Sequence, residues 1–190
     1  MRRLTIGVMG SAGGAMSADL ASKCRELGAA VAGLGCVLLT GACPGLPHYA
    51  ATGCHAAGGL TVGVSPAMSE QEHVERYGSP IDHIDIMIYT GAGLMGREVT
   101  SVRSCDIVIV VGGRSGTLGE FAIAYDEGRP IGVLSGTGGI ADHIDDFLPI
   151  IQKETGSHIT YDENPRRLIE RCVRAYREHP PVIRQHEASK

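Results

Sequence analysis

Metal-ligand and membrane-spanning patterns are missing from this sequence. Its six cysteines include no C-x-x-C pair, and its eight histidines show neither H-x-H nor H-E-x-x-H spacing, so the common arrangements of zinc ligands are absent. It has no run of about 18 apolar residues and no charged-then-apolar leader. We therefore expect no metal site, reduced thiols in the core, no membrane association and a cytoplasmic protein.

Strong charge of either sign is also missing. The chain has 17 Lys and Arg against 21 Asp and Glu, which leaves a net charge of −4. The basic residues are scattered and form no stripe, so binding to nucleic acid or to an anionic membrane surface has no electrostatic support. A small-molecule ligand is the remaining expectation.

Glycine, by contrast, is abundant, and it follows short apolar runs. The 27 glycines are about twice the average share. We expect these glycines to form turns after strands. Apolar residues at helical spacing come after the turns, and the first predicted helix has the apolar residues Met16, Leu20, Cys24, Leu27 and Val31. Strands are predicted at 4–9, 36–40, 60–64, 84–89, 106–111, 130–134 and 158–161. The alternation predicts an α/β fold, a doubly wound, Rossmann-like parallel sheet of about seven strands with helices on both faces.

The length of the chain predicts its domain organisation, and three stretches need a separate prediction: 65–84, 139–152 and 179–190. A chain of 190 residues matches one domain, so we expect a single Rossmann-like nucleotide-binding domain over 1–178 and a C-terminal tail over 179–190, because Pro180-Pro181 cannot continue a helix. The polar residues 65–84, with their histidines, predict a surface loop able to cover a site. A helix is expected over about 139–152.

The strand at 106–111 and the loop after it carry the main functional signal. The chain continues as Gly112-Gly-Arg-Ser-Gly-Thr-Leu-Gly-Glu120 and then shows helical spacing. A glycine loop that leads into a helix leaves N–H groups free, here near Ser115 to Leu118, at the positive end of the helix dipole, which favours a bound phosphate. Thr117 adds a hydroxyl, and Glu120 lies one helical turn further on.

Two more glycine turns follow strands of the same predicted sheet, at Gly10-Ser11 and at Gly41 to Gly45. The carboxyl ends of parallel strands meet at one edge, so we expect the three loops to converge on one crevice. The phosphate- or nucleotide-binding candidates are therefore Gly10, Ser11, Gly41, Gly45, Gly112, Gly113, Arg114, Ser115, Gly116 and Thr117.

Several of these residues also have a purely structural explanation. The glycine loop can be a tight turn that binds nothing, Ser11 and Thr117 can be helix caps, and Glu120 can complement the helix dipole. Arg114 can close the loop through an ion pair or reach a phosphate bidentately. Cys43 can touch a ligand or be a small buried residue.

The loop resembles the PGGxGTxxE signature of the LOG-like family, long labelled "lysine decarboxylase-like". Gly112 stands at the Pro of that signature, Arg114 at its second Gly and Glu120 at its Glu. The family's MxxRK motif has its Arg fifteen residues before that Pro, and Arg97 lies fifteen residues before Gly112. Glu98 stands at the Lys of this motif.

This resemblance implies two alternative functions. The first is that of a nucleoside 5′-monophosphate phosphoribohydrolase, which releases the base, with Glu120 and Arg97 as catalytic residues and no cofactor. A carboxylate at Glu120 would stabilise the positive charge that develops on the ribose. The second is a non-catalytic protein that binds a nucleotide or carries the molybdenum cofactor. We rank the hydrolase first, and the resemblance also implies a homodimer.

Lysine decarboxylation is not supported by the residues. A pyridoxal-phosphate decarboxylase needs a lysine placed for a Schiff base, and the chain has only Lys23, Lys153 and Lys190. None of the three follows a predicted strand at the crevice, so this activity is excluded.

Overall fold

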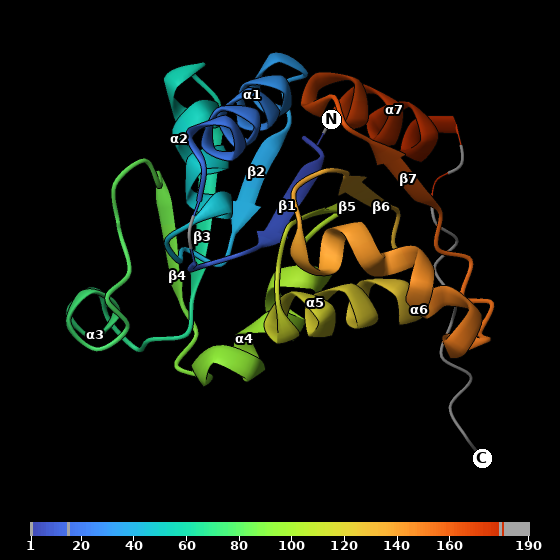
Figure 1. Cartoon of the computed structure of the whole chain (residues 1–190). Coiled ribbons are helices and arrows are strands. Elements are labelled where there is room, and N and C mark those ends of the chain that lie inside the picture. The colour runs from blue at the N-terminus through green and yellow to red at the C-terminus, as the bar shows by residue number, and fades with distance from the viewer. Residues whose placement is uncertain (1, 15, 179, 181–190) are drawn as a thin grey trace.

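Seven parallel strands form one sheet in the described part of the chain, and helices cover both of its faces (Figure 1). The computed structural model describes residues 2–14, 16–178 and 180. The strands are β1 (Thr5–Gly10), β2 (Val37–Thr40), β3 (Leu60–Ser65), β4 (Ile86–Tyr89), β5 (Ile107–Val111), β6 (Ile131–Leu134) and β7 (Ile159–Asp162). The helices are α1 (Ala18–Gly33), α2 (Leu46–Ala56), α3 (Glu70–Glu75), α4 (Gly93–Arg103), α5 (Ser115–Asp126), the 3₁₀ turn η1 (Gly139–His143), α6 (Ile144–Ile151) and α7 (Pro165–Glu178). The predicted fold class is confirmed.

The strand order places a topological switch beside β1. The order is β4-β3-β2-β1-β5-β6-β7, so the chain builds β1 to β4 in one direction and then returns to place β5 on the other side of β1. In this register Val8 pairs with Ile109 and Gly10 with Val111. The connections after β1 and β5 leave in opposite directions, which opens a crevice at the carboxyl ends of these two strands.

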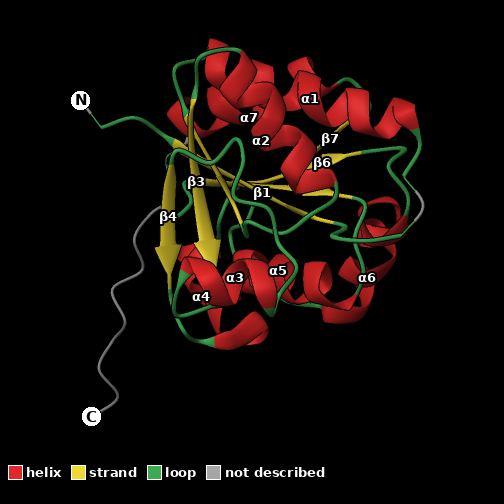
Figure 2. Cartoon of the chain, turned by 90° about the vertical axis from the view of Figure 1, so that its left-hand side faces the viewer, coloured by secondary structure: helices red, strands yellow, loops and turns green. Residues whose placement is uncertain are grey.

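Two apolar layers attach the helices to the sheet. Helices α1, α2 and α7 pack on one face, and α4, α5 and α6 pack on the other (Figure 2). Strand β5 is buried at all five positions because its β-branched side chains alternate between the two layers. This strand therefore has no solvent-facing side, and its ends are the places where polar groups can collect.

The segment 65–84 is not the surface loop that its polarity predicts. It contains α3, and the His73 side chain is fully buried. Ser65 Oγ lies 2.8 Å from His73 Nδ1, and the Pro80 carbonyl oxygen lies 3.1 Å from Nε2. The expectation of surface histidines is wrong here because this ring ties the segment to the end of β3.

The helix predicted over 139–152 is split in the structure. Gly138 and Gly139 have φ values of 74° and 59°, in the left-handed region that favours glycine. The chain therefore makes the 3₁₀ turn η1 first, and the α-helix begins only at Ile144. The predicted tail, 179–190, lies outside the described residues except for Pro180.

Candidate ligand-binding site

The glycine loop after β5 is held by its own peptide groups. The Gly113 N–H donates to Ser11 Oγ (2.7 Å), and the Gly112 N–H donates to Thr137 Oγ1 (2.9 Å). The carbonyls of both glycines accept from N–H groups of η1 at 3.0 Å. Both glycines have positive φ, 58° and 107°, which a residue with a Cβ rarely adopts. Gly112 and Gly113 therefore shape the loop, and these peptide groups are already satisfied.

Three backbone N–H groups in the first turn of α5 have no hydrogen-bond partner among the described residues. Helix α5 has no side-chain cap. Among the described residues, no hydrogen bond satisfies the N–H groups of Ser115, Gly116 and Thr117. The Leu118 N–H, expected to be free, donates to the Arg114 carbonyl at 2.9 Å. Three N–H groups at the positive end of a 12-residue helix are the arrangement that binds a phosphate.

Arg114 extends over the loop that follows β1. Its residue is exposed, and Nη2 lies 3.5 Å from the position of a Cβ built on Gly13. It forms no ion pair or side-chain hydrogen bond with any residue that the structure describes. The structure therefore does not realise the ion-pair alternative, and Arg114 retains all its donors for an anion.

The two other glycine turns pack tightly on the first. A Cβ on Gly10 would clash with the Val111 carbonyl, and a Cβ on Gly45 would clash with the Ser11 carbonyl. The same Ser11 carbonyl accepts from the Leu46 N–H at 2.9 Å. Gly10 and Gly45 thus bring the start of α2 and the ends of β1 and β5 together.

Arg97 is a buried cation with unpaired donors. Its residue is 6% exposed, and its Nε and Nη1 have no hydrogen-bond partner among the described residues. Nη2 lies 3.7 Å from Cys43 Sγ, and a Cβ on Gly41 would overlap the guanidinium. The missing side chain at Gly41 therefore makes room for the cation. Leaving a buried charged group without partners is costly, so this position indicates a ligand.

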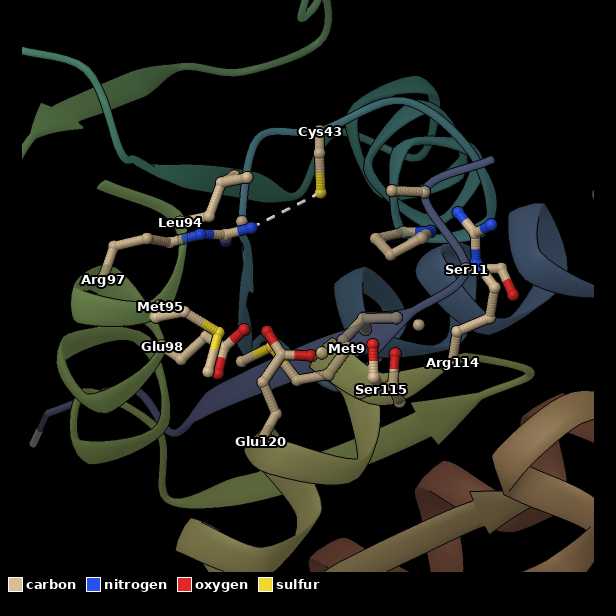
Figure 3. Close-up of a pocket in the computed structure, with 17 residues that line it drawn as sticks. Met9, Ser11, Cys43, Leu94, Met95, Arg97, Glu98, Arg114, Ser115 and Glu120 are labelled. Atoms are coloured by element: carbon tan, nitrogen blue, oxygen red, sulfur yellow. Dashed lines mark hydrogen bonds between the residues drawn. The ribbon is translucent and has the colours of Figure 1, made fainter. Parts of the chain in front are cut away.

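Two buried carboxyl groups lie on the opposite wall of the same cavity. Glu98 and Glu120 are each 7% exposed, and Figure 3 shows both carboxyl groups pointing into the cavity. The pKa of Glu120 is raised to about 7, mainly by burial, with the charge of Arg97 opposing the shift and that of Glu98 adding to it. Burial also raises the pKa of Glu98, again opposed by Arg97. Around neutral pH the Glu120 carboxyl group can therefore both accept and donate a proton.

These groups surround one cavity of about 430 Å³ at the switch between β1 and β5 (Figure 3). Nine of the twelve predicted site residues line it: Gly10, Ser11, Gly41, Arg97, Arg114, Ser115, Gly116, Thr117 and Glu120. Gly45, Gly112 and Gly113 do not line it, because they pack against neighbouring loops instead. The three glycine turns do converge, as expected from the parallel sheet.

The cavity is also lined by Met9, Leu94 and Met95, which the sequence did not single out, and by Cys43 and Glu98, which were not among the predicted site residues. Met9 is the last residue before the first glycine turn, and Leu94 and Met95 lie on the exposed side of α4 at the mouth. Cys43 is half-buried and lines the cavity rather than the core. Glu98 was visible as a departure from the family motif, and its contact with α5 became apparent only in three dimensions.

The described residues contain neither a candidate metal-binding cluster nor a membrane-spanning helix. They include no group of three or more His, Cys, Asp or Glu side chains arranged to hold a metal ion. None of the helices they form is long and apolar enough to cross a membrane.

Comparisons with known proteins give a family model and several similar chains. The model described as the SLOG cluster4 family matches residues 3–169. An uncharacterized protein of Archaeoglobus fulgidus is 33% identical over 134 residues, which span 70% of this chain and 82% of that protein.

Two solved structures are similar over almost the whole chain. The molybdenum cofactor binding protein of Rippkaea orientalis is 29% identical, with a TM-score of 0.73 over 94% of this chain and 98% of that one. The molybdenum cofactor carrier protein of Chlamydomonas reinhardtii is 29% identical, with a TM-score of 0.71 over 90% and 99%.

Proposed function

Because this chain belongs to the SLOG cluster4 family, we propose that its cavity binds a phosphorylated small molecule of the molybdenum-cofactor class and holds it without breaking a bond. The family assignment bears out the resemblance to LOG-like proteins. Solved relatives described as molybdenum cofactor binding and carrier proteins support this function over hydrolysis, the function we ranked first from the sequence.

The observation that carries the proposal is the buried guanidinium of Arg97, whose Nε and Nη1 have no hydrogen-bond partner among the described residues. Buried donors of a cation are stabilised by an anion or a carbonyl oxygen from a ligand. At another side of the cavity, three free N–H groups of α5 and the side chain of Arg114 suit a phosphate. The cavity thus offers donors for both a phosphate and a second acceptor group, which fits a phosphorylated pterin.

A loading experiment with a matched control tests this proposal. The chain is incubated with molybdenum cofactor released from a molybdoenzyme, separated by gel filtration, and assayed for bound molybdenum by mass spectrometry and for pterin by fluorescence after oxidation. We expect one cofactor per binding site. Arg97→Met should weaken binding about 10- to 100-fold, the range for hydrogen bonds to a charged group.

The control variant is Arg103→Met on the same helix. Arg103 is exposed and pairs with Glu127 away from the cavity, so its loss should leave cofactor binding unchanged. Equal binding by wild type and Arg97→Met would contradict the proposal, as would wild-type protein that retains neither molybdenum nor pterin.

The hydrolase is the second candidate, and the pKa of Glu120 favours it. A buried carboxyl group with a pKa of about 7 suits general acid–base work at neutral pH. In this reaction the C1′–N bond breaks, a water oxygen bonds to C1′, and one water proton goes to the departing base, which leaves ribose 5-phosphate. Glu120 would relay this proton: it donates its own proton to the departing base, the resulting carboxylate stabilises the positive charge on the ribose, and the attacking water then returns a proton to it.

A panel of nucleoside 5′-monophosphates decides between the two candidates. Free base, measured by chromatography, would support the hydrolase, and Glu120→Gln should then lower turnover about 100-fold or more with little change in binding. A wild-type chain that binds the cofactor and releases no base from any monophosphate supports the carrier.

The assembly and location of the protein belong to the same proposal. We propose a homodimer, which the family resemblance implies, and a cytoplasmic location, which was expected from the sequence. Sedimentation equilibrium at micromolar concentration checks the assembly, and a single species at the monomer mass would contradict it.

A further inference from the structure

The carboxyl group of Glu98 is an unused acceptor built into the cavity wall. Glu98 extends from α4 to α5, where its two carboxyl oxygens lie 3.3 and 3.1 Å from the positions of Cβ atoms built on Gly116 and Gly119. No hydrogen bond or ion pair joins this carboxyl group to another described residue. The two glycines therefore leave space for a carboxylate, and the carboxylate has no partner within the described chain.

The cavity separates acceptors from donors. Glu98 and Glu120 share one wall, whereas the guanidinium of Arg97 lies against Gly41 and Cys43 across the cavity (Figure 3). The free N–H groups of α5 form a third group of donors. A ligand that satisfies all three must offer an anion, an acceptor and a pair of donors.

A carboxylate binds two parallel N–H donors especially well, as its bidentate pairs with arginine show. A 2-amino-4-oxo ring, present in both guanine and pterin, offers the same pair through its ring N–H and its exocyclic amine. The neighbouring ring carbonyl is an acceptor for a guanidinium. A ring that lacks the amine leaves one oxygen of the carboxylate without a donor, which is costly in a buried site.

We propose that Glu98 is the specificity-determining residue that selects a 2-amino-4-oxo heterocycle in the ligand. This inference rests on the proposed function, since it assigns the ring of the phosphorylated molecule. It gives a physical role to the reversed charge at this position, where the family motif has a basic residue. A lysine there would repel the donor edge that a carboxylate attracts.

Two pairs of phosphorylated probes test the selection. GMP and IMP differ only in the exocyclic amine, and 6-hydroxymethylpterin phosphate differs from the matching lumazine phosphate in having that amine where lumazine has an oxo group. Calorimetry on the full chain should show at least about tenfold tighter binding of the amino member in a pair that binds.

Substitutions at and beside Glu98 should remove this selectivity. Glu98→Gln should bring the two affinities of a pair to within about threefold, because an amide cannot accept two donors with both of its atoms. Gly119→Ala keeps the charge but crowds the carboxylate, so the ratio should fall partway. Since alanine favours a helix over glycine, this second variant should remain folded. Glu26→Gln, on the exposed face of α1, is the matched control and should leave the ratio unchanged.

The outcomes separate the failure of this inference from the failure of the proposed function. Equal affinity within a pair that binds, or a ratio that survives Glu98→Gln, overturns the role of Glu98 and leaves phosphate binding intact. Binding of none of the four probes overturns both. A Glu98→Gln variant whose circular dichroism spectrum and unfolding midpoint match those of the wild type, and whose affinity ratio has fallen, supports the role of Glu98.

Discussion

Buried carboxyl groups lie near both ends of strand β5, and they differ in whether the protein supplies hydrogen-bond donors to them. Before the strand, Asp106 accepts from Arg2 Nη1 and Nη2 (2.8 and 2.6 Å), from the Thr5 N–H (2.8 Å) and from Tyr176 Oη (3.1 Å). After the strand, Glu120 has no partner among the described residues. The first carboxylate is satisfied by the protein, and the second is not.

The pKa values reflect this difference. Burial alone raises the pKa of Asp106, but hydrogen bonds from Arg2, Thr5 and Tyr176 outweigh it and lower the pKa below its usual value. The pKa of Glu120 is raised to about 7, mainly by burial, because the charge of Arg97 opposes the shift only in part and no hydrogen bond lowers the pKa. We infer that Asp106 holds β1, β5 and α7 together, whereas the other end of the sheet keeps unsatisfied groups for a ligand at a cost in stability.

Removing the hydrogen-bonded carboxylate of Asp106 should have the largest effect on the free energy of unfolding. Asp106→Ala should lower the free energy of unfolding by about 2–4 kcal/mol, because it leaves the Thr5 N–H and the Tyr176 hydroxyl without their acceptor. The exposed Arg2 side chain returns to water and adds little to this loss. Urea denaturation at pH 7 measures it. Because the pKa of Asp106 is lowered, its contribution is present above the unfolded pKa, about 3.9, and disappears as the pH falls through the lower folded value. A loss below 1 kcal/mol would show that these contacts are not important for stability.

Removing the charge of Glu120, which has no hydrogen-bond partner among the described residues, should raise the free energy of unfolding rather than lower it. Glu120→Gln should raise the free energy of unfolding of the ligand-free protein by up to about 3 kcal/mol at pH 8, since the pKa rises from 4.5 to about 7. A raised pKa gives stability that is present below pH 4.5 and lost as the pH rises through 7. Urea denaturation at pH 4.5 and pH 8 should therefore show a gain only at the higher pH.

The buried cation provides a smaller test of the same comparison. Arg97→Met should raise the free energy of unfolding by about 1–2 kcal/mol because it removes two buried donors without partners. The same variant should lose ligand affinity, so stability and function should change in opposite directions. A destabilised Arg97→Met variant would mean that the guanidinium stabilises the ligand-free fold.

Removing a single hydrogen bond to Asp106 should have the smallest effect on the free energy of unfolding. Tyr176→Phe removes only the donor to Asp106 Oδ1, so the free energy of unfolding should fall by about 1 kcal/mol. Thermal unfolding of wild type and variant side by side measures it. No change in ligand affinity is expected, because Tyr176 lies on α7, which packs on the other face of the sheet from α4 and α5.

Much of the site was predictable because its parts are local in the sequence. The strand, glycine loop and helix start at 106–120 are contiguous, and hydrophobic spacing and glycine positions suffice to predict them. Arg97 was found through its distance from this loop in the family motif. The segment 65–84 was mispredicted because the burial of His73 depends on Ser65 and Pro80, and no periodic pattern records such contacts.

The sequence by itself determined the alternation of strands and helices, the parallel sheet and the free N–H groups at the start of α5, because each follows from short-range spacing and backbone chemistry. Only the tertiary structure decided which glycines face the cavity, that Gly41 makes room for Arg97, and that Glu98 lies against Gly116 and Gly119. These are contacts between segments far apart in the chain. Whether a charge is paired depends on such contacts, so the difference between Asp106 and Glu120 becomes visible only after folding.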